Sequence, residues 1–73
     1  MPKLPVLSGA NVVKTFHKAG WTAVRQRGSH VVLKQDAFGC VVPKHRELKI
    51  GTLSGILKQA GVSVDEFIAG LDS

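Results

Sequence analysis

Cysteine is nearly absent from the sequence: Cys40 is the only one in 73 residues. A lone cysteine cannot form an internal disulfide or a four-cysteine zinc site. The three histidines lack the spacing of zinc ligands. Asp36 and Glu47 lie in separate segments, and the adjacent Asp65 and Glu66 are expected to cap a helix, so no carboxylate pair supports a metal site. We therefore expect no metal site and no cofactor, and we expect Cys40 to be a small buried hydrophobe within a strand rather than a nucleophile.

Long apolar runs are also missing. No stretch approaches the ~18 apolar residues of a membrane span, and residues 1–7 carry two prolines and a lysine but no apolar segment of a signal peptide. We expect a cytoplasmic protein that does not engage a membrane. With 44% hydrophobic residues, the chain is rich enough in apolar side chains to fold. Its length predicts a single domain over residues 1–73.

Acidic residues are scarce, with five Asp and Glu against ten Lys and Arg. The imbalance is uneven, because residues 1–50 hold nine basic and two acidic residues, whereas residues 51–73 hold one basic and three acidic residues. A basic body with an acidic tail indicates a polyanionic partner such as nucleic acid. Charge alone is equally compatible with a soluble basic domain that binds no nucleic acid.

The first predicted element is a helix between Ser8 and Gly20. Ser8 is a favourable N-cap residue, and Gly20 is suited to the left-handed conformation that ends a helix. Apolar residues at helical spacing predict the buried face, which comprises Val12, Val13, Phe16 and Ala19. The polar residues of the opposite face are expected to be exposed; they are Asn11, Lys14, Thr15, His17 and Lys18.

Three strands are predicted next, over residues 21–26, 30–35 and 40–42, from their aromatic and β-branched content. Turns are expected at residues 27–29 and 36–39, and Pro43 is expected to stop the third strand. Connections this short favour an antiparallel meander. A polar, basic connection follows up to residue 50.

Two more helices are predicted after that connection. The first has Leu53, Ile56, Leu57 and Ala60 on one face, with Thr52 as its N-cap and Gly61 at its end. Ser63 and Glu66 then form a capping box, which opens a short last helix reaching Leu71.

These elements predict an α+β fold with the order α-β-β-β-α and a short C-terminal helix. Two amphipathic helices need a shared apolar surface, and a three-stranded antiparallel sheet with both helices on one face provides it. The other face of the sheet would then be open to solvent or to a partner. This is the layout of the double-stranded-RNA-binding domain.

Residues 25–30, R-Q-R-G-S-H, are the most informative stretch for chemistry. Arginine matches two phosphate oxygens with its donor fork, glycine lets a backbone approach a ligand closely, and histidine exchanges protons near neutral pH. Together these residues could bind a phosphodiester and move a proton at it. The alternative is a polar hairpin whose histidine merely begins a strand.

Strand periodicity predicts which way this histidine points. If Val31 and Leu33 face the helices, then His30, Val32 and Lys34 point to the open face. A slip of one residue in the pairing would reverse this assignment.

A second basic group follows the third strand at residues 44–46. Lys44 and Arg46 are candidates for RNA contacts, or they belong to a solvated loop. His45 is a candidate second proton donor, a substrate contact or a hydrogen-bonded structural residue, and we place the last two roles ahead of catalysis. His17 is expected to be a surface residue of the first helix.

The motifs of the chain, in their order and spacing, resemble those of the HicA toxins. The resemblance covers about residues 8–62, and the segment after Gly61 lies beyond it. It rests on S-G at 8–9, G-W at 20–21, R-Q-R-G-S-H at 25–30, V-P-K-H at 42–45, E-L-K-I-G-T-L at 47–53 and I-L-K-Q-A-G at 56–61.

This resemblance implies a fold like that of double-stranded-RNA-binding domains and an mRNA interferase that acts without the ribosome and blocks translation. It also implies a HicB antitoxin as the protein partner, and it assigns the catalytic histidine to His30. The expected RNA-binding residues are Arg25, Arg27, Gly28, Ser29, Lys34, Lys44, His45 and Arg46.

Because no metal ligands are evident, His30 is expected to act as general base on a ribose 2′-hydroxyl, with Arg25, Arg27 or Lys44 stabilising the transition state. His30 could instead be the general acid, with His45 or water completing the pair. The competing interpretation is a non-catalytic RNA-binding module. A purely structural partner protein is a third interpretation, but it leaves the basic residues of the first fifty unexplained.

Overall fold

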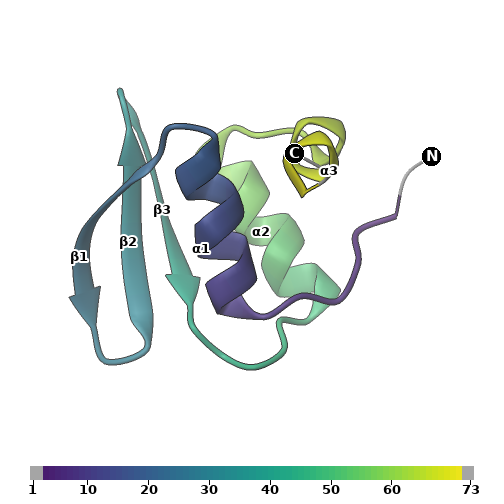
Figure 1. The fold of residues 1–73 in the computed structure, drawn as a ribbon, viewed down its shortest axis with the longest axis horizontal. Coiled ribbons are helices and arrows are strands. Elements are labelled where there is room, and N and C mark those ends of the chain that lie inside the picture. Colours follow the sequence, from purple (N-terminus) through teal and green to yellow (C-terminus); the bar gives the residue numbers. More distant parts are fainter. Residues whose placement is uncertain (1–2, 72–73) are drawn as a thin grey trace.

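The computed structural model describes residues 3–71, and residues 1–2 and 72–73 of the predicted domain lie outside the described residues. Three strands form one antiparallel sheet in the order β1-β2-β3, accompanied by three helices (Figure 1). The elements are α1 (Gly9–Lys18), β1 (Thr22–Arg27), β2 (His30–Gln35), β3 (Phe38–Pro43), α2 (Ile50–Ala60) and α3 (Val64–Leu71). The predicted α-β-β-β-α order with a short C-terminal helix is confirmed.

Most of the predicted helix ends are confirmed by their hydrogen bonds and backbone angles. The Ser8 hydroxyl accepts a bond from the Asn11 amide at 3.1 Å. Gly20 after α1 has a φ of 97°, and Gly61 after α2 has a φ of 71°, which is left-handed backbone. The amide of Glu66 donates to the Ser63 hydroxyl at 3.1 Å, and the Ser63 amide donates back to the Glu66 carboxylate at 3.4 Å.

The predicted N-cap of α2 is wrong. The helix begins at Ile50, with Lys49 as its cap residue and no side-chain capping bond, so Thr52 lies inside the first turn. The cause is a long-range contact, because the Leu48 amide donates to the carbonyl of Leu7 at 2.7 Å and the Leu48 side chain is buried. The chain turns into the helix directly after this anchor, before it reaches the residue with the better capping side chain.

The first and third strands differ from their predicted bounds at the turns. Trp21 precedes β1 instead of opening it, because its amide donates to the Phe16 carbonyl at the end of α1, at 3.0 Å. Its ring is buried edge-to-face against Phe16, with centroids 5.1 Å apart. β3 begins at Phe38, since Gln35 and Phe38 pair across a two-residue turn. The first residue of that turn, Asp36, has a φ of 53°, which aspartate tolerates better than most residues do. β3 also includes Pro43.

The core lies between the helices and the face of the sheet formed by alternate residues of β2 and β3. Val31 and Leu33 on β2 are 3% and 0% exposed, and their partners Val42 and Cys40 on β3 are also buried. The helices contribute the remaining buried side chains, together with Trp21 and Leu48. These helical residues are Val12, Phe16, Leu53, Ile56, Leu57, Ala60 and Phe67. In the described part of the chain, none of the helices is long and apolar enough to cross a membrane.

The predicted faces of α1 need one correction. Thr15, expected on the polar face, is buried, whereas Ala19, expected on the apolar face, is exposed. α3 is the cause: it packs beside α1, and a β-carbon built at Gly70 would lie 3.3 Å from the Thr15 methyl group. The Thr15 hydroxyl stays satisfied in this setting, because it donates to the Asn11 carbonyl at 2.9 Å.

The start of α1 is in close contact with the chain that leaves β3. The Gly9 amide donates to the carbonyl of His45 at 2.8 Å. A β-carbon at Gly9 would overlap the Pro43 carbonyl oxygen and would lie 2.6 Å from the Lys44 Cα, which is closer than van der Waals contact permits. Only glycine therefore fits at the point where α1 crosses residues 43–45.

We predict that Gly9→Ala destabilises the fold by about 1–3 kcal/mol, the typical cost of forcing extra atoms into a packed site. Urea unfolding followed by Trp21 fluorescence measures this change. Gly55→Ala is the matched control, because Gly55 lies in the middle of α2 and a β-carbon there would have no atom within 4 Å. That control should gain about 0.5–1 kcal/mol from helix propensity. Equal effects of the two substitutions would contradict the close contact at Gly9.

Candidate nucleic-acid interface

The sheet surface turned away from the core, here called the open face, carries the predicted histidine. Val31 and Leu33 are buried on the core side, whereas His30 and Lys34 are exposed and Val32 is half-buried. Because neighbouring residues of a strand point to opposite faces, His30, Val32 and Lys34 lie on the open face. The orientation predicted from the sequence is confirmed.

The register of β1 adds two arginines to this face. Directly opposite residues of an antiparallel pair share a face, and Arg27 pairs with His30 while Arg25 pairs with Val32. Arg25, Arg27 and His30 are all exposed. Two guanidinium groups and one imidazole are therefore neighbours on adjacent strands, which lie about 4.8 Å apart.

The turn that joins β1 to β2 consists of Gly28 and Ser29. Gly28 has a φ of 56°, and a β-carbon placed on it would meet no atom within 4 Å. Positive φ at the first central residue is the pattern of a type II′ hairpin turn, which favours glycine there. The Gln26 side-chain amide donates to the Gly28 carbonyl at 3.1 Å. Backbone geometry requires Gly28, and its surface stays open to a ligand.

The basic loop of residues 44–46 lies beside this turn. The Lys44 amide donates to the Ser29 carbonyl at 2.6 Å, and the His45 carbonyl accepts the bond from Gly9. The side chains of Lys44, His45 and Arg46 are exposed. The imidazole of His45 makes no hydrogen bond to any of residues 3–71, so its carbonyl, rather than its side chain, has a structural role.

The candidate residues therefore divide into two groups by position. One end of the hairpin brings six of them together: Arg25, Arg27, Gly28, Ser29, His30 and Lys44. Lys34 shares the open face but lies four residues from His30 along β2, which is about 13 Å. His45 and Arg46 follow Lys44 toward the start of α1.

Carboxylates do not neutralise this surface. Within residues 3–71 none of Arg25, Arg27, Lys34, Lys44 and Arg46 forms an ion pair. Asp36, the acidic residue of the β1–β3 region, lies in the turn between β2 and β3, at the other end of β2 from His30. The arginine and lysine side chains are thus free to bind an anion.

Other reactive groups of the chain do not contribute to this surface. Cys40 is 2% exposed, and its burial raises the pKa of the thiol to about 11. The thiol therefore stays protonated at neutral pH, and the predicted role of Cys40 as a core residue is confirmed. No group of three or more His, Cys, Asp or Glu side chains among the described residues is arranged to hold a metal ion.

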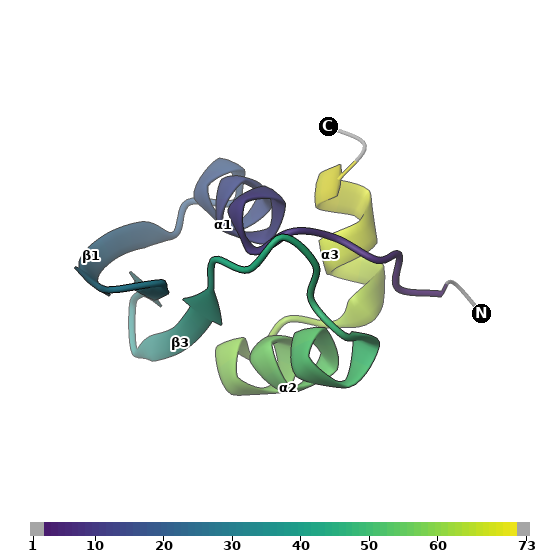
Figure 2. The same cartoon turned by 90° about the horizontal axis from the view of Figure 1, so that it is seen from below.

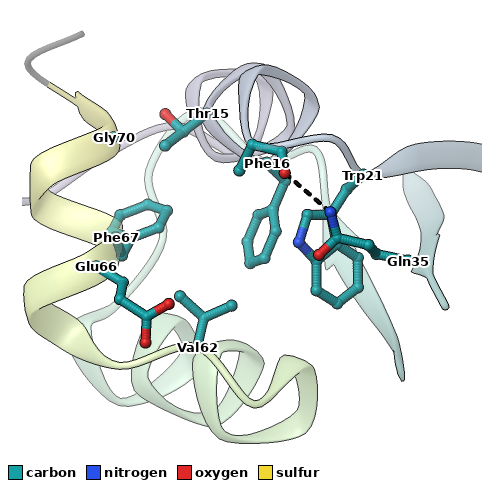
Figure 3. Close-up of a pocket in the computed structure, with 9 residues that line it drawn as sticks. Thr15, Phe16, Trp21, Gln35, Val62, Glu66, Phe67 and Gly70 are labelled. Atoms are coloured by element: carbon teal, nitrogen blue, oxygen red, sulfur yellow. Dashed lines mark hydrogen bonds between the residues drawn. The ribbon is translucent and has the colours of Figure 1, made fainter. Parts of the chain in front are cut away.

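A hollow of about 180 Å³ lies elsewhere, between α1, α3 and Trp21 (Figure 3). None of the predicted site residues lines it. Its one charged lining residue, Glu66, is engaged in the α3 capping box. The lining comprises Thr15, Phe16, Ala19, Trp21, Gln35, Val62, Glu66, Phe67 and Gly70. The predicted site residues lie at the open face and in the basic loop, and not in this hollow.

Two positioning features were missed by sequence reasoning. Gly9 allows the start of α1 to lie against the basic loop. Pro43 is the β3 residue directly opposite His30 on β2, so it lies beside His30 on the open face. A glycine directly after a helix N-cap was the one available signal for the first feature. The pairing of Pro43 with His30 follows from the register of β2 and β3, which depends on the two-residue turn between these strands.

Comparison with known proteins agrees with this geometry. A family model described as HicA toxin of bacterial toxin–antitoxin matches residues 9–62, which include α1, the whole sheet and α2. No curated protein and no solved structure gave a match. The matched stretch is most of the chain and contains every candidate site residue. The chain therefore belongs to the HicA toxin family of bacterial toxin–antitoxin systems.

Proposed function

We propose that the chain is a metal-independent endoribonuclease that cleaves mRNA and thereby blocks translation, and that a HicB-type antitoxin protein restrains it in the cytoplasm. The family membership supports the toxin role. The observation that carries the chemistry is the exposed His30 beside Arg25 and Arg27 on the open face, with Lys44 at the same end of the sheet.

The proposed reaction uses the ribose 2′-hydroxyl of the RNA as nucleophile. A neutral His30 imidazole takes the hydroxyl proton, and the 2′-oxygen attacks the adjacent phosphorus. The bond from phosphorus to the 5′-oxygen breaks, which leaves a 2′,3′-cyclic phosphate on one product. The departing 5′-oxygen takes up a proton and becomes a free hydroxyl on the other product.

The cations of the open face stabilise the charge that develops on the phosphate. Arg27 lies directly opposite His30 on the neighbouring strand, Arg25 lies two residues further along, opposite Val32, and Lys44 is held next to the turn by its backbone bond to Ser29. Fixed positive groups directed at a developing oxyanion are commonly the largest contribution to catalysis. Gly28 and Ser29 let the RNA backbone approach the turn, while Lys34 and Arg46 bind the RNA at a greater distance from the reacting phosphate.

The proton for the 5′-oxygen has two possible sources in this arrangement. His45 lies one residue beyond Lys44, and its imidazole has no hydrogen-bond partner among the described residues. Water is the other source. In the reverse assignment His30 is the general acid, and His45 or water accepts the 2′-hydroxyl proton. Both assignments predict loss of cleavage when His30 is removed.

We predict that His30→Ala lowers RNA cleavage in excess EDTA by about 10²–10⁴-fold, the usual contribution of general acid–base catalysis. RNA binding should change little, because phosphate contacts from Lys and Arg supply most of the affinity. Since His30 is exposed, the variant should fold normally, which circular dichroism checks. His17→Ala, on the exposed surface of α1, is the matched control and should cleave like the unmodified chain.

The second candidate function is a non-catalytic RNA-binding module, for which the fold and the basic open face are equally suited. The cleavage and binding assays of His30→Ala distinguish this module from a ribonuclease. If neither the unmodified chain nor His30→Ala cleaves RNA but both bind it, the binding module is favoured. If both cleave at the same rate, His30 is not the catalytic residue.

A further prediction tests the nucleophile. A single 2′-deoxy substitution on the ribose 5′ to a mapped cleavage point should abolish cleavage at that bond, because the attacking oxygen is gone. The same substitution one nucleotide further away is the control and should leave cleavage intact. Cleavage is measured on end-labelled oligonucleotides by gel electrophoresis. Persistent cleavage at the modified position would show that the nucleophile is not the 2′-hydroxyl.

A further inference from the structure

The rest of the chain contacts one edge of the sheet and leaves the other edge exposed. At the β3 edge, the Gln59 side chain of α2 accepts a hydrogen bond from the Val41 amide at 3.2 Å. At the β1 edge, all six residues of Thr22–Arg27 are exposed. Both views place β1 on the side of the molecule away from α2 and α3 (Figures 1 and 2). β1 is therefore accessible on its faces and along its outer edge.

The outer edge of β1 presents free backbone groups. Apart from its pairing with β2, β1 makes no backbone–backbone hydrogen bond within the described residues. A two-residue hairpin turn closes on a hydrogen-bonded pair, here Arg27 and His30, so the amide and carbonyl of Gln26 point outward. Outward N–H and C=O groups along a strand are a template for another strand. An RNA backbone offers mainly phosphate acceptors, with the ribose 2′-hydroxyl as its one donor, and lacks the paired N–H and C=O groups of a β-strand.

A second copy of the chain is a poor occupant of this edge. The register is interrupted between Ala23 and Arg25, so Val24 forms a bulge that disturbs a flat edge. Pairing two β1 strands would also bring the arginines of both copies together, and like charges on paired strands are destabilising. Bulges and charged side chains are the features by which proteins keep an edge from pairing with itself.

The charges of the hairpin favour an acidic occupant. β1 and β2 contain Arg25, Arg27 and Lys34 but no Asp or Glu. Arg25 and Arg27 lie on one face, because their partners Val32 and His30 do. Carboxylates at alternate positions of an added strand would face both guanidinium groups across a cross-strand distance of about 5 Å.

We infer that the outer edge of β1 is the docking site for an acidic, extended segment of a partner protein, which adds a fourth strand to the sheet. Main-chain hydrogen bonds to the regular stretch around Gln26 provide affinity, and carboxylates paired with Arg25 and Arg27 provide specificity. The bound strand withdraws both arginines from a phosphate next to His30. The resulting inhibition of cleavage rests on the proposed function, whereas the docking itself does not.

Hydrogen exchange of the full chain, measured by NMR, tests the docking. The probe is a capped seven-residue peptide in which glutamate alternates with valine. We expect it to slow exchange of the outward amides of β1, the Gln26 amide among them, by about tenfold at saturation. Exchange of the Val41 amide on the covered edge should not change. The peptide should also inhibit RNA cleavage competitively.

Two control peptides separate strand addition from simple charge attraction. One has the same glutamates but N-methylated backbone amides on its pairing edge, and it should bind about tenfold more weakly because it cannot complete the ladder. The other has lysine in place of glutamate and should also bind at least about tenfold more weakly. Equal binding of the acidic and N-methylated peptides would overturn the inference, as would equal binding of the lysine peptide.

A pair of chain variants gives the complementary test. Gln26→Pro removes the outward amide without removing a donor to β2, and Gln26→Ala keeps that amide while losing the same side chain. Only the proline variant should lose affinity for the acidic peptide.

If the peptide protects β1 but the chain cleaves no RNA, the proposed function fails and the docking site stands. If the chain cleaves RNA and β1 is not protected, the docking site fails alone. Self-association that protects β1 without peptide would also refute it.

Discussion

Alternation along β2 is the constraint on which the rest of the structure depends. Val31 and Leu33 must be buried, because they form the centre of the sheet face that the helices cover. His30 and Lys34 are thereby placed on the opposite face. A shift of one residue in the pairing would bury a histidine and a lysine and expose two core residues. The same packing energy that stabilises the fold therefore keeps the imidazole accessible.

Two backbone hydrogen bonds then join parts of the site that are distant in the sequence. Ser29 in the first turn accepts from Lys44, and His45 accepts from Gly9 at the start of α1. Backbone bonds do not depend on side-chain rotamers, so the loop is positioned while its side chains stay available for a ligand. The arrangement requires a residue without a β-carbon at the crossing point, and Gly9 meets that requirement.

Sequence reasoning succeeded where the determining interaction is local. The Ser8 hydroxyl caps α1 through an amide three residues further on, and the alternation around His30 spans one strand, so both could be predicted from neighbouring residues. It failed where a distant segment decides the outcome. Thr15 is buried by α3, and Thr52 is not a cap because the chain is anchored upstream of it. The motifs named the candidate site residues, but the position of Lys44 beside the turn depends on a long-range backbone bond.

The docking of α3 bears on where this protein's folding unit ends. The family model stops at residue 62, yet Phe67 is 3% exposed and its ring lies 5.9 Å from that of Phe16. The segment shared with the family is thus shorter than the segment that contributes to the hydrophobic core of this chain. A boundary drawn from family membership would leave out α3 and would expose the sides of Phe16 and Thr15 that α3 covers. In this member the C-terminal helix is an integral structural element, and the toxin module is defined by packing and not by motif length.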